Sequence, residues 1–234
     1  MGSSHFYLEF LMAWVKVLKD LGYRNPCIFA LEYTLVPDKV YPTQVQEVLS
    51  GYQFVLSKAV DSSRICLSGD SAGATLILSL LLHYGMTDRW RDDRPGLALL
   101  ISPWVTIVSS RNRDTPSDYL NMDSLHEYAR QFVGRNTSVD NPLASPGKCQ
   151  DVGTWFRASP TEGFVCFYGS EEVFQPEIAR WMGLVRRAEC VCDGREEADG
   201  VHAWPIVGFF TGETKREQLR GIFQMSRVMK LKIP

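Results

Sequence analysis

Arg64-Ile-Cys-Leu-Ser-Gly-Asp-Ser-Ala-Gly73, with the apolar run Ala74-Thr-Leu-Ile-Leu-Ser-Leu-Leu-Leu-His83 directly after it, decides the fold that we expect for this chain. Apolar and strand-favouring residues come first, a Gly-x-Ser-x-Gly string follows, and the second run has the composition of a buried helix. This succession predicts a strand, a sharp turn and a helix, with Ser71 at the turn. The alternative is an ordinary turn between a strand and a helix that carries a serine by chance.

Such a turn would expose Ser71 as a nucleophile. Gly69 and Gly73 are expected to let the strand and the helix approach closely, while the strained turn lifts the Ser71 hydroxyl clear of the sheet. The backbone N–H of Ala72, at the start of the helix, can donate to an oxyanion that develops during attack. Asp70 is expected either to brace the turn through a hydrogen bond or to be a solvated turn residue.

Composition limits the kind of protein and its partners. The 234 residues suit one α/β domain, and 25 basic against 27 acidic residues, a net charge of −2, give no reason to expect a nucleic-acid or anionic-membrane partner. A small-molecule partner fits better. The 6 cysteines contain no Cys-x-x-Cys spacing and are expected to be mostly free, which favours a reducing compartment. With no secretory signal and no segment of membrane-spanning length, we expect a cytoplasmic protein.

Strand and helix patterns alternate along the chain, which predicts a mostly parallel, doubly wound sheet. Helices are expected over residues 5–21, 43–59, 74–85, 124–133, 176–188 and 214–229, and strands over 27–33, 65–67, 96–104, 163–168 and 189–192. Residues 106–160 are richer in Ser, Asn, Asp, Arg and Pro, and we expect an insertion or lid there. The prediction is a single domain over 1–234 with this insertion.

A serine nucleophile needs a general base, nearly always histidine, and a carboxylate that orients the base. On a parallel sheet these groups belong in loops at the carboxyl ends of later strands. Of the 4 histidines, His202 alone follows the last predicted strand, whereas His5 opens the chain and His83 and His126 lie in predicted helices. His202 is therefore the predicted base, with a structural loop histidine as the alternative.

The carboxylate is expected after the preceding strand. There Tyr168-Gly-Ser-Glu-Glu-Val173 offers Glu171 and Glu172, while Glu177 lies a turn further along a predicted helix and fits less well. The order Ser71, Glu172, His202 is the order of nucleophile, acid and base in α/β hydrolases.

Several blocks of the sequence resemble, in the same order, those of the hormone-sensitive-lipase-like esterases, the GDSAG branch of the α/β-hydrolase fold. The resemblance covers nearly the whole chain. The blocks are Glu32-Tyr-Thr-Leu-Val-Pro-Asp38 with Tyr41-Pro42, Gly69-Asp-Ser-Ala-Gly73, Leu100-Ile-Ser-Pro-Trp104, Tyr168-Gly-Ser-Glu-Glu172 and Gly200-Val-His202.

The resemblance implies an α/β-hydrolase fold and hydrolysis of short- to medium-chain acyl or acetyl esters through an acyl-enzyme, with no metal or organic cofactor. It implies that Ser71 is the nucleophile, His202 the base and Glu172 the acid, where the family more often has Asp; Glu172 is preferred over Glu171. It also implies that residues 106–160 form part of a cap, whose other part usually comes from N-terminal helices.

One departure from the family pattern affects the expected activity. Family members carry a His-Gly-Gly-Gly loop whose N–H groups complete the oxyanion hole, and this chain begins just after it, so we expect an N-terminally truncated fold. A strand would then be missing between 27–33 and the strand that enters Ser71, and each buried backbone group left unpaired costs ~1–3 kcal/mol. The alternative function is a catalytically impaired hydrolase fold that binds a small molecule or serves as an interaction module. A nucleotide-binding domain is not favoured, because no Gly-x-Gly-x-x-Gly follows the first strand.

Overall fold

A four-stranded parallel sheet forms the centre of the molecule. The computed structural model describes residues 4–87 and 93–233, and in that part of the chain the strands lie side by side in chain order. They are β1 (Cys66–Asp70), β2 (Leu97–Ile101), β3 (Phe164–Gly169) and β4 (Cys192–Glu197). Every neighbouring pair is parallel, so the carboxyl ends of all four strands meet at one edge of the sheet.

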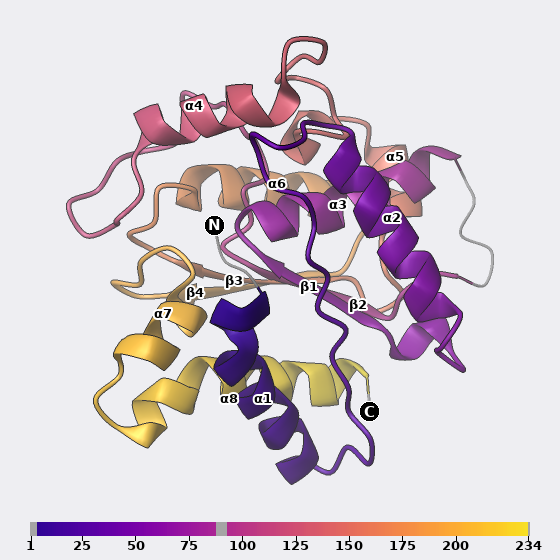
Figure 1. Ribbon diagram of the computed structural model, residues 1–234, viewed down its shortest axis with the longest axis vertical. Coiled ribbons are helices and arrows are strands. Elements are labelled where there is room, and N and C mark those ends of the chain that lie inside the picture. The colour runs from indigo at the N-terminus through magenta and orange to yellow at the C-terminus, as the bar shows by residue number, and fades with distance from the viewer. Residues whose placement is uncertain (1–3, 88–92, 234) are drawn as a thin grey trace.

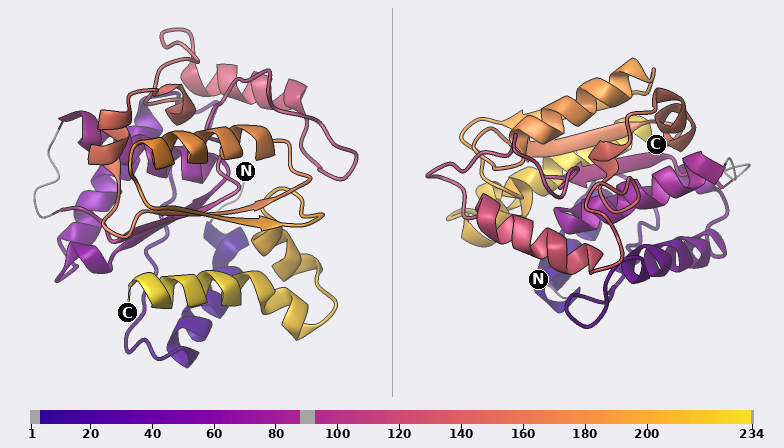
Figure 2. Two further views of the ribbon diagram at one scale, coloured as in Figure 1. Left: turned by 180° about the vertical axis from the view of Figure 1, so that it is seen from behind. Right: turned by 90° about the horizontal axis from the view of Figure 1, so that it is seen from above.

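Helices cover both faces of this sheet (Figures 1 and 2). One side carries α2 (Thr43–Leu56), α3 (Ala72–Thr87), α5 (Val152–Ala158) and α6 (Gln175–Arg187), with α4 (Met122–Val133) outermost. The other side carries α1 (Ser4–Asp20), α7 (Trp204–Thr211) and α8 (Lys215–Lys232). None of the helices in the described residues combines the length and the apolar composition that crossing a bilayer requires.

The sheet separates two hydrophobic cores, because successive side chains of a strand point to opposite faces. Ala98 and Leu100 pack with the helices of the α3 side, whereas Leu97, Leu99 and Ile101 pack with α1, α7 and α8. All residues of β2 and β3 are buried, as the continuous apolar runs in their sequences predict.

Most predicted elements are confirmed, and α5 and α7 are additional short helices. The predicted strand 189–192 is wrong in its position, because β4 begins only at Cys192. The amides of Glu189 and Cys190 donate back to Arg186 and Val185 of α6, and Glu189 has a left-handed backbone with φ 60°. This segment therefore ends the helix and cannot continue a strand.

The predicted strand 27–33 is also wrong. These residues are extended, but they form no strand. Ile28 and Phe29 are exposed, and the side chains of Phe29 and Leu31 approach Gly51 of α2. A strand needs a hydrogen-bonded neighbour about 4.8 Å away, and among the described residues β1 pairs only with β2. β1 is accordingly an edge strand, and its Ser68 is exposed.

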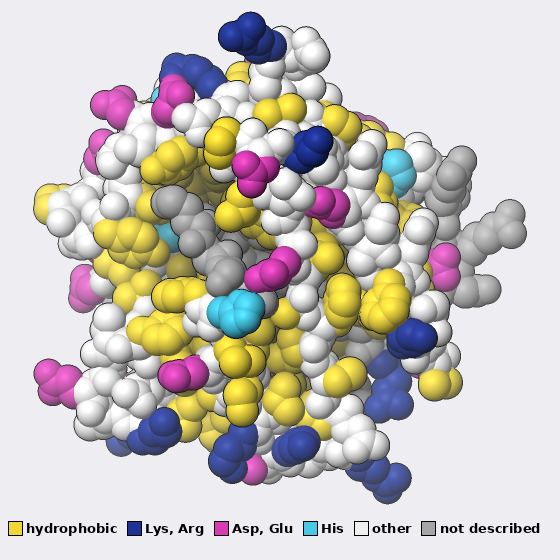
Figure 3. Space-filling view, in the orientation of Figure 1, with side chains coloured by type: hydrophobic (Ala, Val, Ile, Leu, Met, Phe, Trp, Pro, Cys, Tyr) yellow, Lys and Arg dark blue, Asp and Glu magenta, His cyan; other side chains and the backbone are white. Residues whose placement is uncertain are grey.

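Exposed hydrophobic side chains gather in the region of α1 on the face shown in Figure 3. Phe6, Leu8 and Met12 on this helix are 54%, 51% and 64% exposed. The opposite side of α1, which carries Phe10 and Trp14, is buried in the hydrophobic core that α1 shares with α7 and α8. The helix is thus apolar on more of its circumference than the described residues cover.

The contact between α3 and α5 depends on the absence of a side chain at Gly85. A Cβ there would lie 2.8 Å from the Ala158 Cβ and 2.8 Å from the Thr154 carbonyl oxygen. We predict that Gly85→Ala lowers the free energy of unfolding by ~1–3 kcal/mol through overpacking. Gly183→Ala in α6 is the control, because a Cβ there meets only the flexible end of Arg187 at 3.7 Å. It should leave stability unchanged or raise it by up to ~1 kcal/mol. Urea denaturation measures both, and equal losses would contradict the packing argument.

Candidate active site

Ser71 forms a sharp turn between β1 and α3. Its φ of 51° lies in the left-handed region, which is strained for a residue with a side chain. The turn is held by the end of β2: the Ser71 N–H donates to the Ile101 carbonyl at 3.0 Å, and the Ser71 carbonyl accepts from the Trp104 N–H at 3.3 Å. The strand, strained turn and helix predicted from the sequence are therefore confirmed.

Gly69 and Gly73 differ in the space that a side chain would find at each position. A Cβ at Gly69 would lie 2.6 Å from the carbonyl carbon of Gly73 and 2.8 Å from the Ala74 nitrogen. A Cβ at Gly73 would meet nothing within 4 Å. The expectation that both glycines permit the close approach is thus wrong for Gly73, because its backbone, rather than its missing side chain, fills the space beside Gly69.

Ala72 is the first residue of α3. The first N–H groups of a helix have no acceptor within the helix. At this turn the first helical hydrogen bond runs from the Thr75 N–H to the Ser71 carbonyl, so the helix itself offers no acceptor to the Ala72 N–H. Ala72 is thus placed where the sequence predicts an oxyanion donor, and that role stays a prediction.

Asp70 connects the turn to α1. Its Oδ2 accepts a hydrogen bond from the Tyr7 hydroxyl at 2.9 Å. Burial raises the pKa of Asp70, and burial together with the Asp70 charge raises the pKa of Tyr33 to about 12. The hydrogen bond to Tyr7 fits the predicted bracing of the turn, and this role of Asp70 stays a prediction.

Glu172 and Glu171, the two candidate acids, have different environments. The Glu172 side chain is fully buried, and its Oε2 accepts from the Gly169 N–H at 2.9 Å and from the Ser102 hydroxyl at 2.5 Å. Burial raises the pKa of Glu172 to about 8, against the lowering effect of these two hydrogen bonds. Its Oε1 is buried and has no hydrogen-bond partner in the described part of the chain. Glu171 is partly exposed and makes its contacts here through its backbone.

His202 lies in the loop after β4 and is 3% exposed. The ring of Phe174 contacts its imidazole edge to face, with 5.2 Å between the ring centroids. Burial lowers the pKa of His202 to about 3, so the ring is neutral at physiological pH. Like the Glu172 Oε1, the His202 Nδ1 is buried and has no hydrogen-bond partner within residues 4–87 and 93–233.

Ser102 joins the loops that carry these two side chains. Its hydroxyl donates to Glu172 and accepts from the Ala203 N–H at 2.8 Å, one residue beyond His202. Ser102 is fully buried and has a positive φ of 44°. Sequence reasoning misses Ser102, although its place after a buried strand and before a proline puts it at the sheet edge where Ser71, Glu172 and His202 gather.

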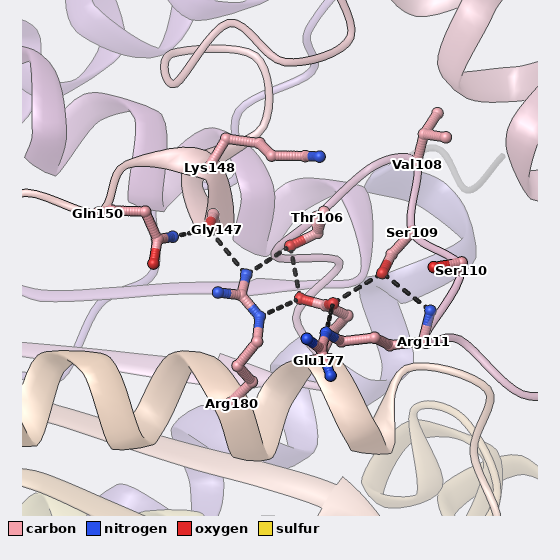
Figure 4. A pocket seen from close by; sticks show the side chains of 10 residues that line it. All are labelled: Thr106, Val108, Ser109, Ser110, Arg111, Gly147, Lys148, Gln150, Glu177 and Arg180. Atoms are coloured by element: carbon pink, nitrogen blue, oxygen red, sulfur yellow. Dashed lines mark hydrogen bonds and ion pairs between the residues drawn. The ribbon is translucent and has the colours of Figure 1, made fainter.

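Glu177, the less favoured acid, belongs to a different site. It lines an open polar pocket of about 380 Å³ to which Ser71, Glu172 and His202 do not contribute (Figure 4). Its carboxylate accepts from Thr106, Ser109 and Arg180 at 2.7–2.9 Å, and these bonds lower its pKa. Glu177 is committed to this network. In the described part of the chain, no group of three or more His, Cys, Asp or Glu residues is arranged to hold a metal ion.

Residues 17–206 match a family model described as alpha/beta hydrolase fold. An acetyl-hydrolase of Streptomyces hygroscopicus is 29% identical over 181 residues, covering 76% of this chain and 57% of the relative. Steryl acetyl hydrolase 1 of Saccharomyces cerevisiae is 24% identical over 192 residues, covering 73% and 43%. The chain thus spans about half the length of the curated relatives it matches.

Solved structures share the fold over the whole chain. An esterase from the bacterial hormone-sensitive lipase family superposes with a TM-score of 0.82 at 20% identity, covering 100% of this chain and 73% of that one. The hormone-sensitive lipase homologue EstE7 from a metagenome library gives a TM-score of 0.80 at 21% identity, covering 100% and 74%.

The two glycines allow a direct test of the turn geometry. We predict that Gly69→Ala disrupts the turn and lowers the unfolding free energy by ~1–3 kcal/mol, because its Cβ collides with backbone that cannot move independently. Gly73→Ala should be neutral or stabilising, since its Cβ enters open space. Thermal denaturation followed by circular dichroism compares the two, and a Gly73→Ala loss as large as that of Gly69→Ala would refute the assignment.

Glu172 and His202 predict an unusual dependence of stability on pH. Between about pH 6.5 and pH 8 the unfolded chain has an ionised Glu172, whereas the folded chain keeps it protonated. The folded state then binds more protons, so stability should fall by up to ~1.4 kcal/mol per pH unit as pH rises. His202 acts in the opposite sense, and only below pH 6.5, where its unfolded form is protonated and its folded form is neutral until about pH 3.

Urea denaturation across the interval from pH 6.5 to 8 measures this dependence. Glu172→Gln should remove the fall, and Glu171→Gln, the neighbouring change of the same kind, should retain it. A fall that persists in Glu172→Gln would show that another group causes it.

Proposed function

Because this chain belongs to the alpha/beta hydrolase fold family, we propose that it is a serine hydrolase that cleaves carboxylic esters. In this proposal Ser71 is the nucleophile, His202 the general base and Glu172 the acid that orients the base. The domain is a single hydrolase unit, and residues 106–160 form part of a cap over the site.

One observation carries the proposal. Among the described residues, the Glu172 Oε1 and the His202 Nδ1 are both buried without a hydrogen-bond partner, and Ser102 bonds to Glu172 and to Ala203, the residue after His202. A buried polar atom without a partner costs ~1–3 kcal/mol, so a hydrogen bond between these two atoms would be stabilising. A carboxylate oxygen and an imidazole N–H satisfy each other, which is the acid–base contact that a triad requires.

The proposed reaction uses the electrostatics of this buried pair. His202 is neutral, so its Nε2 can take the proton of the Ser71 hydroxyl while the oxygen attacks the ester carbonyl. Ionised Glu172 stabilises the imidazolium that results. The imidazolium then returns the proton to the leaving alcohol, and water activated by His202 releases the acid from the acyl-enzyme. Since the pKa of Glu172 is about 8, the rate should rise with pH towards that value.

Ala72 supplies the proposed oxyanion donor through its backbone N–H. Oxyanion holes normally use at least two donors, and the loss of one costs ~10²–10³ in rate. A second donor is not assigned among the described residues. This is the observation that favours the alternative function, a hydrolase fold that binds an ester-like ligand without turning it over.

The substrate class that we propose is an ester of a short acyl group, with acetyl as the first candidate. Relatives over much of the chain are named acetyl-hydrolase and steryl acetyl hydrolase. These names support an acetyl group on the acid side.

We predict that the chain hydrolyses p-nitrophenyl acetate and that Ser71→Ala lowers kcat by at least ~10³-fold, because no other group can form the acyl-enzyme. Ser68→Ala, which changes an exposed serine of β1 three residues before Ser71, is the matched control and should keep full activity. Intact-mass spectrometry after treatment with a fluorophosphonate should show one adduct in the parent chain and none in Ser71→Ala. Ligand binding without turnover or adduct would support the binding module instead.

A further inference from the structure

Residues 111–121, between β2 and α4, cross the loops that carry Glu172 and His202; we name this segment the strap. Besides Asp118, three of its residues bond to the loop after β3 or the loop after β4. The Arg113 N–H donates to the Val173 carbonyl at 3.2 Å, the Thr115 hydroxyl donates to the Glu171 carbonyl, and the Tyr119 hydroxyl donates to the His202 carbonyl at 3.2 Å. The strap therefore contacts the backbone on both sides of the candidate acid and at the candidate base.

Asp118 is the strap residue that contacts both loops with one side chain. Its Oδ2 accepts from the Val173 N–H at 2.8 Å, and its Oδ1 accepts from the His202 N–H at 3.4 Å. Val173 directly follows Glu172. One rigid carboxylate thus spans the two loops and fixes the distance between the backbone of the acid and the backbone of the base.

We infer that Asp118 is a positioning residue, which holds the Glu172 and His202 loops at the separation that lets their side chains act together. The inference rests on the proposed function. Asp118 acts through backbone amides and not on the substrate. A catalytic pair must be held within about 0.5 Å of its productive geometry, and here the residue that does so belongs to the insertion rather than to either catalytic loop.

Asp118 also faces Glu172 electrostatically. Its charge raises the pKa of Glu172, which makes the acid harder to ionise. The other titratable groups near Glu172 are Tyr119, Cys166 and His202, and each is shifted towards its neutral form. Burial is the main cause of the raised pKa of Glu172, and the Asp118 charge adds to it from outside the Glu172 loop.

Asp118→Asn tests both effects. The amide has one acceptor oxygen, so it can accept from only one of the two N–H groups, and its NH₂ faces the other. We expect kcat for p-nitrophenyl acetate to fall ~10–100-fold with KM changed less than ~3-fold, and the rising limb of the pH–kcat profile to move to lower pH. Asp118→Glu, which keeps the charge, should restore the position of that limb. Asp123→Asn, the same change at an exposed position in α4, should alter neither.

Hydrogen–deuterium exchange gives a readout that does not depend on turnover. Amides in the loops around Val173 and His202 should exchange faster in Asp118→Asn, and those of β2 should not, which also shows that the variant is folded. Parent-like kcat and pH profile in Asp118→Asn would overturn the inference. If the parent chain itself proves inactive, the proposed function fails separately; faster exchange in both loops would still support the role of Asp118 in holding them, and unchanged exchange would overturn it.

Discussion

The carboxyl end of β2 is the point on which the site depends. The Ile101 carbonyl accepts from Ser71, and the Ser102 N–H donates to the Phe167 carbonyl of β3 at 2.7 Å. The Ser102 hydroxyl then bonds to Glu172 and to the residue after His202. Ile101 and Ser102 therefore connect three segments: the turn at Ser71 after β1, the loop after β3 that carries Glu172, and the loop after β4 that carries His202. Because β2 is buried on both faces, this connection is rigid.

Burial explains the chemistry that the site is suited to. It raises the pKa of Glu172 and lowers that of His202, so both groups are held in their neutral forms near pH 7. A neutral imidazole can accept a proton, and an acid poised near pH 8 can stabilise the resulting cation when ionised. The same desolvation makes an unpaired buried atom costly, and among the described residues neither the Glu172 Oε1 nor the His202 Nδ1 has a hydrogen-bond partner.

The segment between β2 and α4 also contributes to this arrangement. Its strap bonds to the backbone of both loops, and Asp118 does so with a single carboxylate. A change in the position of the strap would therefore alter the positions of the Glu172 and His202 loops. A movement of the strap that admits a ligand would therefore also move the loops that carry Glu172 and His202.

The sequence by itself determined the parallel α/β class, the turn at Ser71 and the set of residues gathered at one sheet edge, because these follow from local periodicity and from the alternation of strands and helices. It did not determine whether residues 27–33 pair as a strand, since an apolar extended segment becomes a strand only where a neighbour offers hydrogen bonds. Nor could it separate the reasons for Gly69 and Gly73, or reveal Ser102 and Asp118. The contacts of Ser102 and Asp118 join residues that lie 55 to 101 positions apart, and only the tertiary structure decides which buried polar groups meet.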